Sequence, residues 1–284
     1  SSPSSMVTLL SPKHVMECLG LSRVTIEDGK VVEVTEPRVK RCPIFEKYRG
    51  IKELTPEAVK QNIEYRMGAF GMCTDSRETS MKDFLSFGVS ETLSTGLSDG
   101  VLDAVVLAAD GCGTAVVTQP DIVQGLGGRI SGIRETTPIA KVIEAVGPGN
   151  VLDPEKTPID MIAGVEKAYA MGYRKVAVTT ASVAEAEEIR GRHKDAVIAL
   201  VHTSGTSPED AAKAFEVCDI ITACASKNIR AIAKERKDLL IAGSGIPVLG
   251  VTEAGKKLIE RRLEITGKKP WDPSQKEDPP SPLI

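Results

Sequence analysis

The sequence has few aromatic residues, little net charge and no long apolar run, and each shortage excludes a class of function. Aromatic side chains make up 4% of the 284 residues, too few for the stacking platforms that bind single-stranded nucleic acid. A formal net charge of −3 gives no electrostatic reason to expect a nucleic-acid partner. No apolar stretch approaches the roughly 18 residues of a membrane-spanning helix. We therefore expect neither a nucleic-acid nor a membrane partner and, without a secretion signal, a cytoplasmic protein.

The six cysteines form no Cys-x-x-Cys pair, so the sequence shows neither a zinc-ribbon nor a thioredoxin motif. A disulfide scaffold is not expected in a reducing cytoplasm. Dispersed cysteines in loops and at strand ends can ligate an iron–sulfur cluster, and the candidate ligands are Cys42, Cys73, Cys112 and Cys224. The alternative is that these thiols are buried and inert, as free cysteines commonly are. We predict Cys18 and Cys218 to be core residues on helices.

The N-terminal part shows a hairpin and a helix start. Residues 23–36 alternate apolar and polar residues around Asp28-Gly29, a pair suited to a type I′ turn because both central residues need positive φ. Thr55-Pro56 then predicts a helix, with the Thr hydroxyl as the cap and Pro where no N–H is needed. The same pattern predicts helix starts at Thr137-Pro138, Thr157-Pro158 and Ser207-Pro208.

From about residue 96 the sequence alternates short apolar runs with amphipathic stretches. Four runs follow an aspartate, at 103, 195, 219 and 238, and a fifth follows Lys175. Strands that are apolar on both faces belong in parallel sheets covered by helices. We therefore predict an α/β fold with a three-layer, Rossmann-like, mostly parallel sheet, and a smaller N-terminal part containing a β-hairpin and a helix. The expected division is residues 1–95, 96–267 and a flexible tail over 268–284.

Reactive and hydroxylated residues gather where the predicted strands end. Ligands of open parallel sheets bind outside the carboxyl ends of the strands, so we predict a shared pocket there. His202, Lys227 and Asp110 are its candidate acid–base groups, and Ser226 is a candidate ligand-binding residue. The alternative is ordinary turn and cap chemistry: a structural histidine, a solvated lysine and a turn-capping aspartate.

A glycine-rich stretch over 124–132 is a candidate anion-binding loop. Backbone N–H groups freed by glycine can form an anion-binding nest, to which an arginine adds charge. The candidate residues are Gly125, Gly127, Gly128, Arg129 and Ser131. The spacing matches neither a Walker A nor a dinucleotide-binding motif, and the alternative is a loop with a packing role.

Residues 104–134, AVVLAADGCGTAVVTQPDIVQGLGGRISGIR, resemble the hallmark of the methanogenesis marker protein 8 family. Further matches lie in NIEYRMGAFGMCT, VLDPEKTPID, VHTSGTSPEDA and DIITACASKNIR, so the resemblance covers about residues 18–265. It implies an archaeal methanogen and a connection with methyl-coenzyme M reductase or its assembly and activation proteins.

Three functions are compatible with these features. The first is an assembly, activation or maturation factor for methyl-coenzyme M reductase, with or without an iron–sulfur cluster. The second is a lyase or transferase acting on an anionic metabolite at the strand ends. The third is a sensor that uses the same pocket without turnover. The fold alone does not separate them, because this architecture supports many functions.

Overall fold

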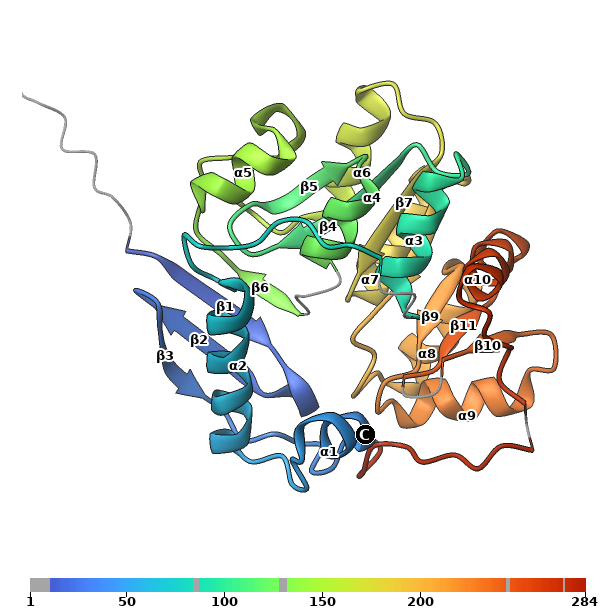
Figure 1. The fold of residues 1–284 in the computed structure, drawn as a ribbon. Coiled ribbons are helices and arrows are strands. Elements are labelled where there is room, and N and C mark those ends of the chain that lie inside the picture. Colours follow the sequence, from blue (N-terminus) through green and yellow to red (C-terminus); the bar gives the residue numbers. More distant parts are fainter. Residues whose placement is uncertain (1–10, 84–86, 128–131, 244–245, 273) are drawn as a thin grey trace, which may run out of the picture.

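The computed structural model describes residues 11–83, 87–127, 132–243, 246–272 and 274–284. Two sheets organise these residues (Figure 1). The smaller sheet is antiparallel in the order β3-β2-β1-β6, with bounds β1 Lys13–Glu17, β2 Arg23–Glu27, β3 Lys30–Val34 and β6 Ile133–Glu135. β6 comes from far along the chain, so the smaller sheet is completed by a segment that follows the first strands of the larger one.

The predicted hairpin is present at β2–β3. Asp28 and Gly29 have φ of 51° and 76°, as a type I′ turn requires. Helix α2, Pro56–Phe70, contacts this sheet through β3. Its Val59 and Ile63 are buried in the same cluster as Val24 and Ile26 of β2.

The larger sheet has the order β10-β11-β9-β8-β7-β4-β5. Its central strands β4, β7, β8 and β9 are parallel, and β5 and β11 run antiparallel to their neighbours. The predicted mixed α/β fold with a mostly parallel sheet is therefore confirmed. The strand bounds are β4 Ala104–Ala109, β5 Gly113–Val117, β7 Val176–Thr180, β8 Val197–Leu200, β9 Ile220–Thr222, β10 Leu240–Ala242 and β11 Val248–Gly250.

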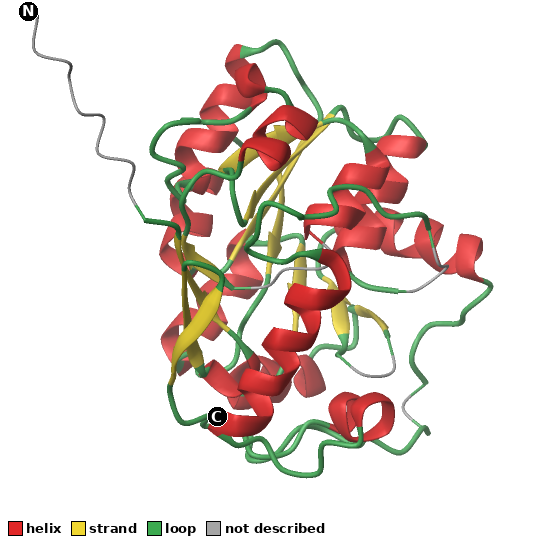
Figure 2. Cartoon of the chain, turned by 60° about the vertical axis from the view of Figure 1, so that its left-hand side comes forward, coloured by secondary structure: helices red, strands yellow, loops and turns green. Residues whose placement is uncertain are grey.

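Helices cover both faces of this sheet (Figure 2). One face carries α3 Val89–Ser98, α4 Pro120–Ile122, the π-helical turn η2 Val123–Gly127 and α10 Glu253–Thr266. The other carries α6 Met161–Ala170, α7 Val183–Arg192, α8 Pro208–Val217 and α9 Lys227–Glu235. The remaining helical segments are α1 Pro43–Arg49, α5 Ala140–Val146 and the short turns Leu19–Leu21 and Pro148–Asn150. No described helix is both long and apolar enough to cross a bilayer.

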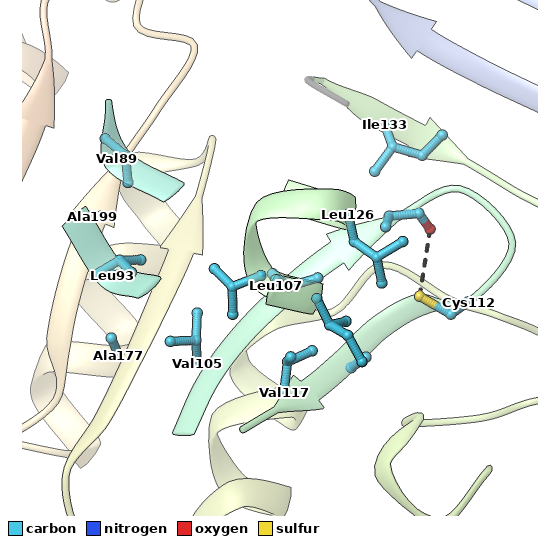
Figure 3. Packing of buried hydrophobic residues seen from close by; sticks show 14 of the residues in the cluster. Val89, Leu93, Val105, Leu107, Cys112, Val117, Leu126, Ile133, Ala177 and Ala199 are labelled. Carbon is cyan, nitrogen blue, oxygen red and sulfur yellow. Dashed lines mark hydrogen bonds between the residues drawn. The ribbon is translucent and has the colours of Figure 1, made fainter. Parts of the chain in front are cut away.

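The central strands are apolar on both faces because each face has its own core. Val105 and Leu107 of β4 pack in one buried cluster (Figure 3), whereas the alternate residues Ala104 and Val106 pack in the other. Successive side chains of a strand point to opposite faces. A strand between two helical layers therefore reads as an unbroken apolar run, which is the pattern that predicted this sheet.

The capping pattern predicted some helix starts correctly. Thr55 and Ser207 accept hydrogen bonds from Ala58 N and Asp210 N, at 3.1 Å each. The helix starts predicted at Thr137 and Thr157 are wrong, because α5 begins after Ile139 and α6 begins after Asp160. Both hydroxyls have long-range partners instead. Thr137 Oγ1 accepts from Lys13 N, and Thr157 Oγ1 donates to the carbonyl of Thr136.

Residues 268–284, which were expected to form a flexible tail, contact the large sheet at β10 and the segment that precedes α1. Trp271 N donates to the carbonyl of Ile241, and Ser281 forms a β-bridge with Arg41. Arg41 also pairs with Asp278, at 2.7 Å between Nη1 and Oδ1. Residues after α10 therefore run from the edge of the large sheet back to α1, where the chain ends in Figure 1.

Candidate functional site

A cavity of about 900 Å³ lies at the carboxyl ends of β7, β8 and β9, and we call it the strand-end cavity. Its walls include the ends of these strands, β4, η2, the start of α3, the end of β1, the start of β6, the segment around α1, and the residues after α10. The size suits a small-molecule ligand. The cavity lies outside the carboxyl ends of parallel strands, which is where the sequence predicts a pocket.

His202 and Cys224 line the cavity at the ends of neighbouring parallel strands. β8 and β9 pair Leu200 with Ile221, so the two residues follow this pair by two and three positions. Both have positive φ, 56° for His202 and 45° for Cys224. Residues other than glycine uncommonly adopt this conformation, although histidine does so more often than cysteine. Such backbone strain is found preferentially at functional sites.

The left-handed turn at Cys224 is held by its surroundings. Arg230, which is 9% exposed, donates from Nε and Nη2 to the Cys224 carbonyl at 2.9 and 2.6 Å. The next residue, Ala225, donates from its backbone N to Ser204 Oγ at 3.0 Å. Thr222 Oγ1 lies 3.4 Å from Cys224 Sγ. These contacts fix the turn and orient the thiol.

The imidazole of His202 has no hydrogen-bond partner among the described residues. The pKa of His202 is lowered to about 4, first by burial and then by the charge of Arg134, against the opposing charge of Glu17. The ring is therefore neutral near pH 7, and its nitrogens are available to a molecule in the cavity. Arg134 and Glu17 line the same cavity and pair with each other, at 2.9 Å between Nη2 and Oε2.

Two further thiols line the strand-end cavity, Cys18 and Cys42. The expectation that Cys18 is a helical core residue is wrong, because it follows β1 and is only half-buried. Burial raises its pKa to about 12. Cys42 precedes α1 and packs in a small cluster with Ala225.

The residues after α10 supply charge and an aromatic ring to the cavity. Lys268, Lys269 and Trp271 line it, and neither lysine has a carboxylate partner among the residues described. Trp271 is the only tryptophan of the chain. The sequence prediction missed all three, because the prolines and charges of this segment are typical of a disordered tail.

Asp110, Cys73 and Cys112 lie elsewhere, in the buried core. The Asp110 carboxylate pairs with Arg77 at 3.1 Å, and both side chains are fully buried. It also accepts from Cys73 N at 2.7 Å. Asp110 does not line the strand-end cavity, because the chain after β4 turns back into β5 and this hairpin turn is covered.

We call Asp110, Arg77, Cys73 and His14 the Asp110 cluster. Burial lowers the pKa of His14, against the nearby charge of Asp110, and its Nδ1 lies 2.6 Å from Thr136 Oγ1. Cys73 also has positive φ, 59°. Burial raises the pKa of the Cys73 thiol well above its usual value, so this cysteine is a structural residue.

Lys227 and Ser226 act at the start of α9. Ser226 is the N-cap, and its Oγ accepts from Ile229 N at 3.2 Å. Lys227 is exposed and does not line the cavity, and its backbone N donates to the carbonyl of Ile284. For these two residues the structure supports the cap and solvated-lysine alternatives.

The glycine-rich stretch is described only in part. Gly125 lies in η2 against residue 79, where a Cβ would approach Thr79 O to 2.3 Å, which is a packing role. Gly127 lines the strand-end cavity beside Ser90. Gly128, Arg129 and Ser131 lie outside the described residues, so their anion-binding role stays a prediction.

The four proposed cluster ligands do not come together. Cys42 and Cys224 line the cavity, whereas Cys73 and Cys112 are packed in the main core. The Cys112 thiol donates to the carbonyl of Ala109 (Figure 3), and burial raises its pKa to about 12. No three His, Cys, Asp or Glu side chains of the described residues are grouped as a metal site needs. This donor arrangement does not fit the expected iron–sulfur cluster.

The fold and the cavity define a mixed α/β protein with a ligand-sized site at the carboxyl edge of its parallel strands. The chain belongs to the family described as "Uncharacterized protein conserved in archaea (DUF2099)", whose model matches residues 14–264. It is 41% identical over 263 residues to "Uncharacterized protein MJ0054" of Methanocaldococcus jannaschii, covering 90% of this chain and 92% of that relative. No solved structure matches it significantly. The archaeal family is thus established, and the finer resemblance to methanogenesis marker protein 8 stays a prediction.

Proposed function

We propose that this chain is an enzyme, a lyase or a transferase, that binds a small anionic molecule in the strand-end cavity. The observation that carries the proposal is that His202, Cys224, Lys268 and Lys269 line one cavity of about 900 Å³, the two lysines having no carboxylate partner among the described residues. Ligand sites combine apolar walls with a few placed polar groups. Val105, Leu107 and Leu93 are among the apolar residues of these walls.

In this proposal the lysines bind the anionic group and the strand ends act on the rest of the molecule. Lys268 and Lys269 offer ammonium groups that no carboxylate of the described residues neutralises. A neutral imidazole such as that of His202 can accept or donate a proton once a ligand is bound. A sensor would use the same groups for binding and would release its ligand unchanged.

Trp271 provides the test, because the only tryptophan of the chain lies in the cavity wall. Citrate, inorganic pyrophosphate and 8-anilinonaphthalene-1-sulfonate serve as anionic probes, and Trp271 emission is followed in a titration. We expect saturable changes with at least one probe. In the variant Lys268→Ala/Lys269→Ala the dissociation constant should rise about tenfold, since charge-assisted contacts contribute roughly 1.5–3 kcal/mol and exposed ones less.

Lys237→Ala is the matched control. Lys237 is exposed and precedes β10, so it lies at the amino ends of the parallel strands, away from the carboxyl ends that form the cavity. Its removal should leave probe binding unchanged. If no probe changes Trp271 emission, or if both lysine variants weaken binding equally, the anionic-ligand proposal fails.

A second candidate function follows from the sequence resemblance: assembly, activation or maturation of methyl-coenzyme M reductase in a methanogen. It is supported by the relative in Methanocaldococcus jannaschii and by two exposed aromatic residues. Tyr48 of α1 is 71% exposed and Tyr65 of α2 is 58% exposed, and tyrosine is enriched in protein interfaces.

Anaerobic purification from a methanogen should recover the reductase or its assembly proteins with the wild type. Tyr48→Ala/Tyr65→Ala should lose them; recovery of neither partner by the wild type would contradict this function.

A further inference from the structure

We propose that Cys224 is a covalent nucleophile for an activated acyl compound, an ester or a thioester, bound in the strand-end cavity. This inference rests on the proposed function, because it requires a ligand in that cavity. It gives Cys224 a role different from the metal ligation expected from the sequence.

Cys224 lies in a strained turn between a strand and a helix. β9 ends at Thr222, Cys224 has a φ of 45°, and the N-cap of α9, Ser226, follows two residues later. A strained strand-to-helix turn of this kind presents a nucleophile above the edge of a sheet in other α/β enzymes. The flanking residues Ala223 and Ala225 are small and buried, so the thiol is the only functional side chain at the tip of the turn.

The strain at residue 224 is retained although glycine would adopt the same backbone conformation without it. Glycine adopts positive φ without penalty, and thirteen glycines of the described chain do so. At residue 224 a cysteine occupies such a position, and Arg230 holds it there with two hydrogen bonds to its carbonyl. Backbone strain at a residue that lines a cavity indicates a function for the side chain of that residue.

The other five thiols are less accessible or less easily ionised than a nucleophile needs to be. Cys73, Cys112 and Cys218 are buried in the cores, and burial raises the pKa of each. A raised pKa lowers the thiolate fraction, and the thiolate is the reactive form. Of the remaining cavity thiols, Cys18 has a pKa raised to about 12 by burial. Cys42 is only 8% exposed, whereas Cys224 is only partly buried.

His202 completes the chemical step. The Cys224 sulfur attacks the carbonyl carbon of the bound ester or thioester, and the thiol proton passes to the neutral His202 imidazole. A carbon–sulfur bond forms as the bond to the leaving group breaks, and the leaving alkoxide or thiolate takes the proton from His202. Water or an acceptor nucleophile then cleaves the acyl–Cys224 thioester and restores the thiol. The step consumes no oxidant or reductant.

The experiment compares the six cysteines within one reduced, anaerobic wild-type protein. Iodoacetamide is added for short times, and the alkylation rate of each cysteine is measured by peptide mass spectrometry. We expect Cys224 to react at least tenfold faster than each of the other five. A slower or equal rate at Cys224 would overturn the proposal, and this readout does not depend on whether a variant folds.

The acyl step is tested with p-nitrophenyl acetate as the probe. Release of p-nitrophenolate should show a burst, and an acetyl group should be found on Cys224. Cys224→Ser should abolish the burst. His202→Asn should slow it at least tenfold, because the proton acceptor is lost. Asparagine is chosen as the replacement because it tolerates the positive φ of this position. Acetylation of other cysteines only would overturn the assignment.

The same samples separate this inference from the proposed function. If Trp271 emission still reports anion binding while Cys224 is unreactive, the nucleophile is wrong and the ligand site stands. If Cys224 is acetylated but no anionic probe binds, the thiol chemistry stands and the anionic-ligand proposal is wrong. If both readouts fail, both proposals fail.

Discussion

The Asp110 cluster and the wall of the strand-end cavity contain the same kinds of residues but differ in their partners. Each has a histidine with a lowered pKa and a cysteine with positive φ. In the cluster, Asp110 is bonded to Arg77 and to Cys73 N. In the cavity, the His202 imidazole has no partner among the residues described. Residue types alone therefore do not distinguish a structural cluster from a candidate site. The Asp110 cluster also contains a buried atom without a partner in the described part of the chain, Arg77 Nη2, so the distinguishing feature is that His202 lines a cavity and Asp110 does not.

The difference originates in the connection that follows each strand. β8 and β9 lead into helices, so their carboxyl ends remain at an open edge, as expected for parallel sheets. β4 leads into the antiparallel strand β5 through a tight turn at Asp110 to Cys112. That turn is covered, and its aspartate has become the anion of a buried ion pair.

The largest effect should come from breaking the ion pair of the Asp110 cluster. Arg77→Met leaves the Asp110 carboxylate buried without its counter-charge, which typically costs about 3–5 kcal/mol. Urea unfolding should show this loss, and Arg77→Met/Asp110→Asn should recover part of it. The alkylation rate of Cys224 should stay unchanged in the double variant. A loss below about 1 kcal/mol in Arg77→Met would mean that the cluster is not a structural unit.

A smaller effect is expected from the histidines as pH falls. The pKa of His202 is about 4 in the folded protein against 6.5 unfolded, so between these values the unfolded chain binds more protons. Stability should therefore rise with pH across this window, be complete above about pH 6.5 and be lost toward pH 4. His202→Asn should flatten this dependence by up to about 3 kcal/mol.

His14 serves as the comparison for the pH prediction, because its pKa is lowered in the same direction. The slope that remains in His202→Asn should include its contribution. Urea unfolding at a series of pH values measures both. Equal slopes in the wild type and His202→Asn would show that His202 is not buried as a neutral group.

The smallest effect concerns the two strained cysteines. Cys224→Gly should be more stable than Cys224→Ala by about 1 kcal/mol, because glycine relieves the left-handed strain. Cys73→Gly should show the same advantage over Cys73→Ala. Both Cys73 variants should lose more stability overall, since its thiol is packed against Met16 in the core. Thermal unfolding measures the four variants, and a Gly variant no more stable than its Ala counterpart would contradict the strain argument.

Local patterns predicted the central fold because a strand between two helical layers leaves an unbroken apolar run in the sequence. They also predicted the turn at Asp28-Gly29. The same Asp-Gly signal stands between apolar runs at Asp110-Gly111, and applying it there would have identified β5. Pairings between distant segments, such as β1 with β6, have no local signal.

The candidate site was predictable only at the strand ends. His202 and Cys224 follow predicted strands, so the general rule for parallel sheets placed them at one edge. Glu17 and Arg134 reach the cavity through the small sheet, whose position relative to the large one is a matter of tertiary packing. Lys268 and Trp271 reach it through a segment whose composition is typical of disorder.

The late arrival of β6 has a consequence for protein synthesis. β1 pairs with β2 on one side and with β6 on the other, so one edge of β1 stays unpaired on the ribosome until Ile133 has been translated. At roughly 5–20 residues per second, the chain between Val34 and Ile133 takes on the order of ten seconds to emerge. An open strand edge can pair with another chain. We therefore expect nascent chains to be most prone to aggregation in this interval. A lower growth temperature or co-produced chaperones should raise the soluble yield.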